Sequence, residues 1–152
     1  MAQWFECKVK YDKNTGDATV KSVSESYLVD ALSFTEAEAR IIEEMQVYIS
    51  GEFKVDSVKR VRMSEIFFDE DGDKWYKAKV NFITIDERKG VEKRTSCYMY
   101  VQASEFAKAL QNLMEGMKGT MSDFEIASIT ETMILDVFKE DLSGAKAEET
   151  KK

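Results

Sequence analysis

The sequence predicts an α+β fold made of tandem pseudo-duplicated ββαβ repeats, with antiparallel-rich sheets that share one core and two helices. The first observation is a repeated segment: WFECKVKY, from Trp4 to Tyr11, returns as WYKAKVNF, from Trp75 to Phe82. The second is that strand-like and helix-like segments follow each copy in the same order. The third is that most matched positions are apolar, as in two halves with similar cores. Later matches pair Phe53, Val55, Ser57, Val58 and Phe67 with Phe124, Ile126, Ser128, Ile129 and Phe138.

Chance similarity between two amphipathic segments is the alternative explanation of the repeat. The length of 152 residues suits one domain, or two small repeats that share a core. We expect residues 1–140 to form a single domain made of two ββαβ repeats, 3–68 and 74–139. The remaining segment, 141–152, has Leu142 as its one large apolar residue, so it cannot offset its ordering entropy by burial. We expect it to be a flexible tail.

Residues 3–11 alternate between apolar and polar side chains, which is typical of a half-buried strand. A polar turn at 12–17, with Gly16 available for a positive φ, precedes a second strand at about 18–31. The two strands therefore predict a hairpin. The first strand has one apolar and one mostly polar face, formed by Phe5, Cys7, Val9 and Tyr11 and by Trp4, Glu6, Lys8 and Lys10.

A helix is predicted to begin at Ser33, because Glu36 follows at the spacing of a capping box. In that motif the serine hydroxyl and the glutamate carboxylate each accept a hydrogen bond from a backbone amide. Gly51 is the expected stop signal, and a third strand follows over 53–67. The predicted buried stripe of the helix consists of Phe34, Ala37, Ile41, Met45 and Ile49.

The acidic run 69–73 separates the two repeats. Its glycine stands at the fourth place, whereas a calcium-binding EF-hand loop needs glycine at the sixth, so we expect a tight turn. The second repeat is predicted to have a strand at 74–85, a turn at 86–90, a strand at 92–103, a helix that Ser104 caps and that ends near Gly119, and a strand at 122–138.

The order of strands follows from the handedness of the connections. A right-handed crossover through the helix makes the third strand of each repeat parallel to the second. The third strand is therefore antiparallel to the first and can lie beside it. One helix on three strands gives a single repeat a thin core. The short acidic turn also suggests that the third strand forms a hairpin with the next repeat. We therefore expect the two halves to exchange their third strands.

Composition narrows the possible classes of function. Histidine is absent and Cys7 and Cys97 are the two cysteines, which excludes His-based triads and leaves too few soft ligands for a zinc site. No nucleophile–base pair, glycine-rich phosphate loop or metal-ligand spacing is present, so we expect neither an enzyme nor a cofactor. Without a long apolar run or an export signal, we expect a cytoplasmic protein with reduced thiols, in which Cys7 is a core residue.

The polar face of the first strand in each repeat is the candidate binding surface. Aromatic rings beside lysines on an open sheet are typical of single-strand binders, where a ring stacks on a base and the lysines follow the phosphates. The candidate residues are Trp4, Lys8 and Lys10 in the first copy, Trp75, Lys77 and Lys79 in the second, and Lys59, Arg60 and Arg62, with Lys93 and Arg94, as extensions of the basic surface.

The same residues also fit a purely structural role. The tryptophans can close the ends of a core, and lysines commonly protect edge strands against aggregation. The net charge of −7 disfavours binding of duplex by the whole surface, although it leaves room for a local basic patch.

The segments WFECKVKY, YLVDALSFTEAEARIIEEM, ISGEF, and GMKGTMSDFEIASITET followed by DVF resemble an uncharacterised family of gut bacteria and their phages and mobile elements. The resemblance covers nearly the whole chain to Phe138, and SFTEAEA is its most specific part. The family is a domain of unknown function, so the resemblance implies no activity and transfers no catalytic residues. It implies an accessory role in a phage or mobile element.

The leading hypothesis is therefore a non-enzymatic binding protein that holds single-stranded nucleic acid on its Trp/Lys sheet face. The alternative is a structural or protein–protein interaction module, which forms a homo-oligomer through sheet edges or captures a partner protein. A weaker hypothesis is a small-ligand site between the halves. We expect no membrane association.

Overall fold

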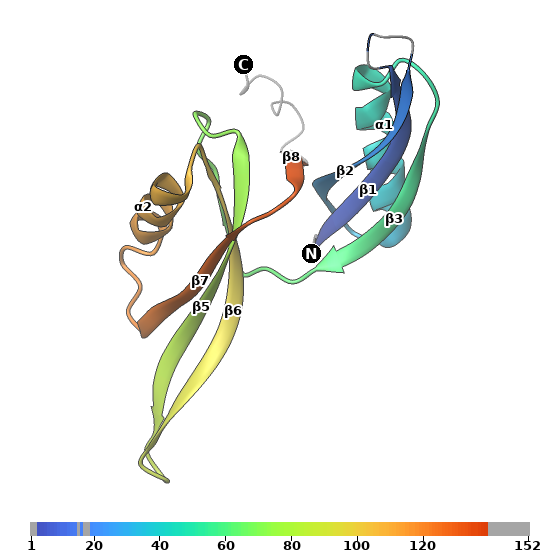
Figure 1. The fold of residues 1–152 in the computed structure, drawn as a ribbon. Helices are drawn as coiled ribbons and strands as arrows, with labels where there is room; N and C mark the ends of the chain where they lie inside the picture. The colour runs from blue at the N-terminus through green and yellow to red at the C-terminus, as the bar shows by residue number, and fades with distance from the viewer. Residues whose placement is uncertain (1–2, 15, 17–18, 140–152) are drawn as a thin grey trace. The chain divides into compact units, whose positions relative to one another are not determined.

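The computed structural model describes residues 3–14, 16 and 19–139 (Figure 1). The predicted tail at 141–152 lies outside these residues. Two helices and eight strands in two mixed four-stranded sheets confirm the predicted α+β class. The elements are β1 (Gln3–Asn14), β2 (Val20–Ala31), α1 (Phe34–Tyr48), β3 (Phe53–Val61), β4 (Glu65–Phe67), β5 (Lys74–Asp86), β6 (Val91–Ala103), α2 (Phe106–Gly116), β7 (Asp123–Glu131) and β8 (Ile134–Phe138).

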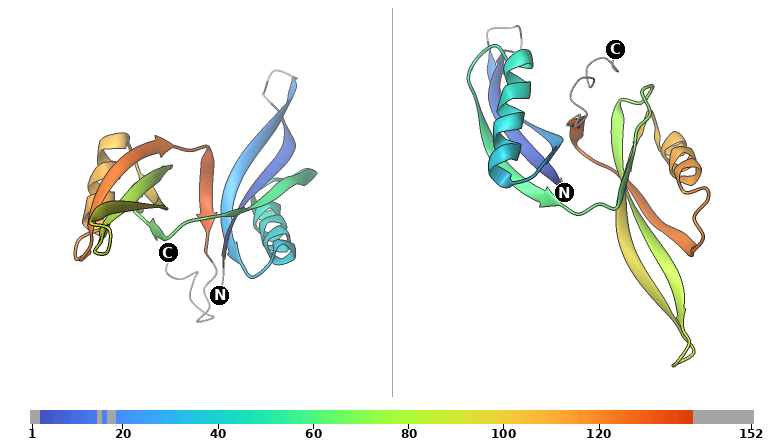
Figure 2. Two further views of the ribbon diagram at one scale, coloured as in Figure 1. Left: turned by 90° about the horizontal axis from the view of Figure 1, so that it is seen from below. Right: turned by 180° about the vertical axis from the view of Figure 1, so that it is seen from behind.

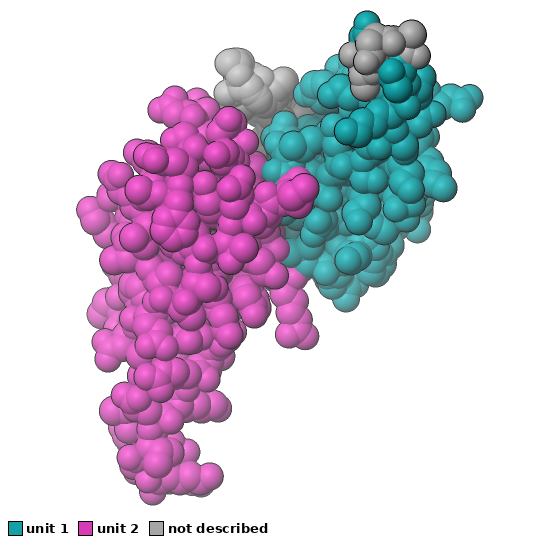
Figure 3. Space-filling view, in the orientation of Figure 1, with its two compact units in different colours: residues 1–61, 134–152 teal, residues 62–133 magenta. Residues whose placement is uncertain are grey.

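The chain folds into two compact units (Figure 3). Unit 1 comprises Met1–Val61 and Ile134–Lys152, and unit 2 comprises Arg62–Met133. Among the described residues, each unit contains one sheet with one helix on one of its faces (Figure 2). Each unit also has its own cluster of buried apolar side chains. Two clusters therefore replace the one shared core that the sequence predicts, because each helix packs on the sheet of its own repeat. That residues 1–140 act as a single domain stays a prediction.

The two sheets have equivalent strand orders, β3-β1-β2-β8 in unit 1 and β7-β5-β6-β4 in unit 2. The pairs β1–β2 and β5–β6 are the predicted antiparallel hairpins. The first and third strands of each repeat shift register at one equivalent point, after Lys8 and after Lys79. Asp56 and Ala127 are the extra residues of these two β-bulges. The shared bulge supports the internal repeat.

The predicted exchange of the third strands is wrong. β3 pairs with β1 and β7 pairs with β5, each within the unit of its own repeat. The helix crossover explains this pairing, because it returns the chain to the sheet that the helix covers. The exchange takes place one segment later, where β4 joins the second repeat beside β6 and β8 joins the first repeat beside β2. Both exchanged strands run parallel to their neighbours.

The exchange also divides the predicted strands 53–67 and 122–138. Each is interrupted where the chain passes from one unit to the other, at 62–64 and at 132–133. The repeats 3–68 and 74–139 therefore do not coincide with the two compact units, since each repeat contributes its last strand to the other unit.

The start of α1 confirms the predicted capping residue. Ser33 is the N-cap, and its Oγ accepts a hydrogen bond from the backbone N–H of Glu36 (3.1 Å). The Glu36 carboxylate accepts a hydrogen bond from the N–H of Leu32, one residue before the cap. The fully buried residues of α1 are Ala37, Ile41 and Met45, all from the predicted stripe, whereas Phe34 at the first turn is 47% exposed.

The start of α2 differs from the prediction. Its N-cap is Glu105, which makes no side-chain capping bond, so the predicted cap by Ser104 is wrong. Compared with α1, one more residue stands between the serine and the first helical phenylalanine, Phe106. Ser104 therefore lies one position before the cap. Ala109, Leu113 and Met117 form the buried stripe.

Arg40 holds the exchanged strand β8 in unit 1. Its guanidinium extends from α1 and forms an ion pair with Asp30 of β2 (2.7 Å), and the two side chains are 16% and 9% exposed. The same guanidinium donates to the carbonyl oxygen of Phe138 in β8 (3.5 Å). One side chain therefore connects α1, β2 and β8.

In unit 2, neutral amide side chains form hydrogen bonds at the equivalent positions. Asn112 of α2 donates to the Asp69 carboxylate (2.8 Å) and to the carbonyl of Gln102 in β6 (3.0 Å). The Gln102 amide accepts from the backbone N–H of Asp69 and donates to the carbonyl of Gly72, both at 2.9 Å. Gly72 N–H also donates to the Asp69 carbonyl (2.8 Å), which confirms the tight turn predicted at 69–73.

The substitution Gly72→Ala tests this turn. A β-carbon at residue 72 would lie 2.5 Å from the carbonyl carbon of Ala103, a backbone atom of β6. We expect the free energy of unfolding, measured by urea denaturation, to fall by about 1–3 kcal/mol, the usual cost of overpacking. Gly51→Ala is the matched control, because a β-carbon there would have no neighbour within 4 Å. Equal stabilities of the two variants would contradict the described turn.

Candidate nucleic-acid interface

The candidate interface lies on the sheet face opposite the helix, which we call the outer face. Figure 2 shows α1 on the other face of this sheet. In β1 the outer face carries Trp4, Lys8 and Lys10, while Phe5, Cys7 and Val9 lie in the core on the side of α1. Lys8 and Lys10 are exposed, and Trp4 is half-buried. Unit 1 therefore has the predicted lysines on the predicted face.

The third strand adds two exposed lysines to the outer face of unit 1. The pairing register places Lys59 opposite Glu6, and it places Lys54 directly opposite Lys10. The sequence analysis missed Lys54, since only the strand register with its bulge shows which β3 residues share this face. In the described part of the chain, no ion pair involves Lys8, Lys10, Lys54 or Lys59.

Serines accompany these lysines. Lys8 lies between Ser26 of β2 and Ser57 of β3 in the register, and Ser24 lies opposite Lys10. Hydroxyl and ammonium groups are both hydrogen-bond donors that suit phosphate oxygens. The carboxylates of Glu6 and Asp12 lie on the same face of β1, where they border the lysines and limit the basic area.

Arg60 and Arg62 do not extend this surface as predicted. Arg60 follows Lys59 in the strand and points to the helix side, where its guanidinium carbon lies 5.4 Å from the centre of the Phe34 ring. Arg62 is exposed and lies beyond the end of β3, where unit 2 begins. Of the three predicted residues, the structure places only Lys59 with the β1 lysines.

Trp75 is not available as a stacking platform. It is 2% exposed, and the Phe68 ring meets it edge-on with 5.5 Å between the ring centres. Its carbonyl oxygen accepts hydrogen bonds from both the N–H and the hydroxyl of Thr132, at 2.9 Å and 2.8 Å. The Trp75 ring is therefore part of the packing of unit 2, as in the alternative structural role of the two tryptophans.

The lysines of unit 2 are also less free than those of unit 1. Lys77 and Lys79 are half-buried, and the Lys77 ammonium lies 4.6 Å from the centre of the Tyr98 ring. Of the two residues expected to extend the basic surface, Lys93 and Arg94, the arginine adds no unpaired charge, since it forms ion pairs with Glu92 (3.3 Å) and Glu125 (3.1 Å).

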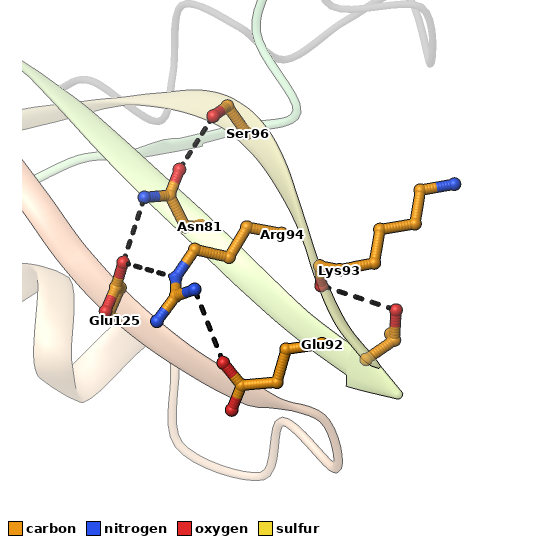
Figure 4. Close-up of polar contacts among 7 residues, drawn as sticks. Asn81, Glu92, Lys93, Arg94, Ser96 and Glu125 are labelled. Atoms are coloured by element: carbon orange, nitrogen blue, oxygen red, sulfur yellow. Dashed lines mark hydrogen bonds and ion pairs between the residues drawn. The ribbon is translucent and has the colours of Figure 1, made fainter. Parts of the chain in front are cut away.

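Figure 4 shows the polar network around this arginine. The Glu125 carboxylate accepts hydrogen bonds from the Asn81 amide and from Arg94, both at 3.1 Å. Ser96 donates to the Asn81 carbonyl oxygen (2.7 Å). The hydrogen bonds from Asn81 and then Arg94 lower the pKa of the Glu125 carboxyl, which is therefore ionised at neutral pH.

The two units differ most clearly at one pair of equivalent positions. Lys10 faces Lys54 across β1 and β3, whereas Asn81 faces Glu125 across β5 and β7. Two like charges lie opposite each other in unit 1, and a hydrogen-bonded neutral–acidic pair occupies the same place in unit 2. At these equivalent positions, the outer face of unit 1 therefore carries unpaired positive charge and that of unit 2 does not.

The Cys7 thiol is not available for covalent chemistry at neutral pH. Cys7 is fully buried in the core of unit 1, as predicted, and both cysteines are free. Burial, with a smaller contribution from Glu6, raises the pKa of the Cys7 thiol to about 12, so it stays protonated at neutral pH.

The family comparison agrees with the extent of this fold. A family model described as "Domain of unknown function (DUF4494)" matches residues 3–140. The chain belongs to this family. The match spans both units and both exchanged strands. A comparison with curated proteins found no match.

Membrane-spanning helices were also sought in the described residues. Neither α1 nor α2 is long and apolar enough to cross a bilayer.

The two tryptophans should differ in their effect on stability. Trp75→Ala removes a buried ring and should lower the free energy of unfolding by about 3–5 kcal/mol. Trp4→Ala removes a half-buried ring of the same size and should cost clearly less. Urea denaturation of both variants measures the difference. Equal losses would contradict the different environments of the two rings.

Proposed function

We propose that this protein is a non-enzymatic binding protein that holds single-stranded nucleic acid on the outer face of unit 1. The observation that carries the proposal is the set of four exposed lysines on this face without an ion-pair partner among the described residues. The members of this basic surface are Lys8, Lys10, Lys54 and Lys59.

The positions of these lysines suit a single strand of nucleic acid that runs across β1 and β3. Lysines on neighbouring strands can follow successive phosphates, and the exposed Ser24 opposite Lys10 can donate a further hydrogen bond. Trp4 offers one partly exposed ring at the end of the same face, which suits a single stacked base. The net charge of −7 gives long-range repulsion that opposes binding elsewhere on the chain. The lysine–phosphate contacts release counterions, so the affinity should fall as salt rises.

The biological setting of this function is part of the proposal. The sequence resemblance to proteins of phages and mobile elements suggests an accessory role in handling single strands in that context. The absence of histidine from the sequence and the protonated Cys7 thiol support binding without catalysis.

A second candidate function is a structural module that oligomerises. It is favoured by the strands β3 and β7, each of which is the longer of the two edge strands of its sheet. The buried Trp75 and the ion-paired Arg94 (Figure 4) also fit this candidate, because neither side chain is free to bind nucleic acid on unit 2.

Fluorescence anisotropy of a labelled mixed-sequence oligonucleotide tests the nucleic-acid proposal. The variant Lys8→Gln/Lys10→Gln removes two positive charges from the central strand of the basic surface. We expect weaker binding, and we expect the slope of log affinity against log salt to fall by about 0.7 for each phosphate that the variant no longer neutralises.

The matched control is Arg88→Gln/Lys89→Gln, which removes the same charge from exposed residues of the β5–β6 turn. Its salt slope should equal that of the wild-type protein. The proposal fails if the wild-type protein does not bind at low salt, or if the control variant loses as much affinity as the β1 variant.

A further inference from the structure

The outermost strands β3 and β7 carry opposite charges. Each has nine residues, pairs on one side with the first strand of its repeat, and has no strand on its other side among the described residues. The two strands are equivalent in the repeat, including the position of their bulges. The charged residues of β3 are Lys54, Asp56, Lys59 and Arg60, and those of β7 are Asp123, Glu125 and Glu131.

Although their charges differ, β3 and β7 have similar apolar residues. Both strands place three half-buried apolar side chains on the helix side, at equivalent positions. The two equivalent edge strands therefore share an apolar pattern but carry net charges of opposite sign. These residues are Phe53, Val55 and Val58 in β3, and Phe124, Ile126 and Ile129 in β7.

We propose that β3 of one molecule pairs with β7 of a second copy of this chain. The two edges are equivalent edges of the same fold, so a rotation about an axis perpendicular to the sheet brings them together. That rotation makes the strands antiparallel and keeps both helices on the same side of the joined sheet. Unpaired N–H and C=O groups of both edges then become hydrogen-bonded.

One register of β3 against β7 places complementary residues opposite each other on both faces of the joined sheet. If Lys59 of one copy lies opposite Glu125 of the next, Val58 lies opposite Ile126 and Val55 opposite Ile129. An opposite-charge pair on the outer face and apolar pairs on the helix side each stabilise neighbouring strands. Glu125 is bound to Arg94 in its own sheet, but its side chain is 44% exposed and can accept from a further donor.

The charges also exclude the pairings between identical edges. Two β3 strands would bring lysines against lysines, and two β7 strands would bring carboxylates against carboxylates, both of which destabilise a sheet. The bulges further weaken pairing at either edge, so the joint is reversible. Because the contact joins a β3 edge to a β7 edge, it is heterologous, and each molecule can use both of these edges to build a larger assembly.

This inference concerns the second candidate function and does not depend on nucleic-acid binding. Its test uses edge residues, whereas the test of nucleic-acid binding uses Lys8 and Lys10 on the central strand β1. A protein that binds oligonucleotide without assembling, or assembles without binding, therefore separates the two proposals.

Sedimentation velocity at low salt, over a range of protein concentrations, measures the assembly. The wild-type protein should show an average mass that grows with concentration and returns to that of the monomer at high salt. One variant reverses the charge of β3, Lys54→Glu/Lys59→Glu, and a second reverses the charge of β7, Asp123→Lys/Glu125→Lys. Each variant alone should stay monomeric, because its two edges then carry charges of the same sign.

The mixture of the two variants gives the decisive result. The reversed β3 edge of the first variant complements the reversed β7 edge of the second, and their unchanged β7 and β3 edges complement each other. An equal mixture should therefore assemble again at the same concentration. Circular dichroism confirms that each variant is folded, and Lys54→Gln/Lys59→Gln replaces the first variant if charge reversal prevents folding. A wild-type protein that stays monomeric at every concentration, or single variants that assemble as the wild type does, would overturn the proposal.

Discussion

Each sheet of this protein is completed by a short strand that the other repeat supplies. β4 and β8 leave their own repeats and pair in parallel with the second strand of the other sheet. Each ends in a phenylalanine that packs against the core it joins. Phe138 stacks on Tyr27 with 5.7 Å between the ring centres, and Phe67 lies over Gly116 of α2, where a β-carbon would come within 2.5 Å of the ring. Neither repeat therefore forms a complete unit from its own residues.

The two repeats secure the exchanged strands with different chemistry at equivalent places. Unit 1 uses the nearly buried ion pair of Arg40 and Asp30, whose partners would each be costly to leave unpaired. Unit 2 uses Asn112 and Gln102 around Asp69. The hydrogen bond from Asn112, followed by that from the Asp71 backbone, lowers the pKa of Asp69. This contribution to stability is present above the ordinary aspartate pKa of about 3.9 and is lost as pH falls through the lower folded-state value.

The sequence was informative about elements and less so about how they combine. Alternation located the strands, and the capping box located the start of α1 at Ser33, because both signals act over a few residues. The exchange was assigned to the wrong strands, since the interruptions at 62–64 and 132–133 contain no proline or glycine to mark them. The binding surface was predicted in part: Lys59 and Arg60 are neighbours in sequence but point to opposite faces, and Trp4 and Trp75 match in sequence but differ in burial. Face and burial depend on register and packing, which a pattern of residue types does not contain.

Residue-resolved amide hydrogen exchange tests the exchanged-strand arrangement most directly. The comparison is between a chain that ends at Lys139 and a chain that ends at Met133, which lacks β8 but keeps every other strand. Loss of β8 should raise the exchange rates of β2 and of the rest of the unit 1 sheet, while β5 and β6 in unit 2 keep their protection. Equal protection of β2 in both chains, or a loss of protection confined to unit 2, would contradict the account.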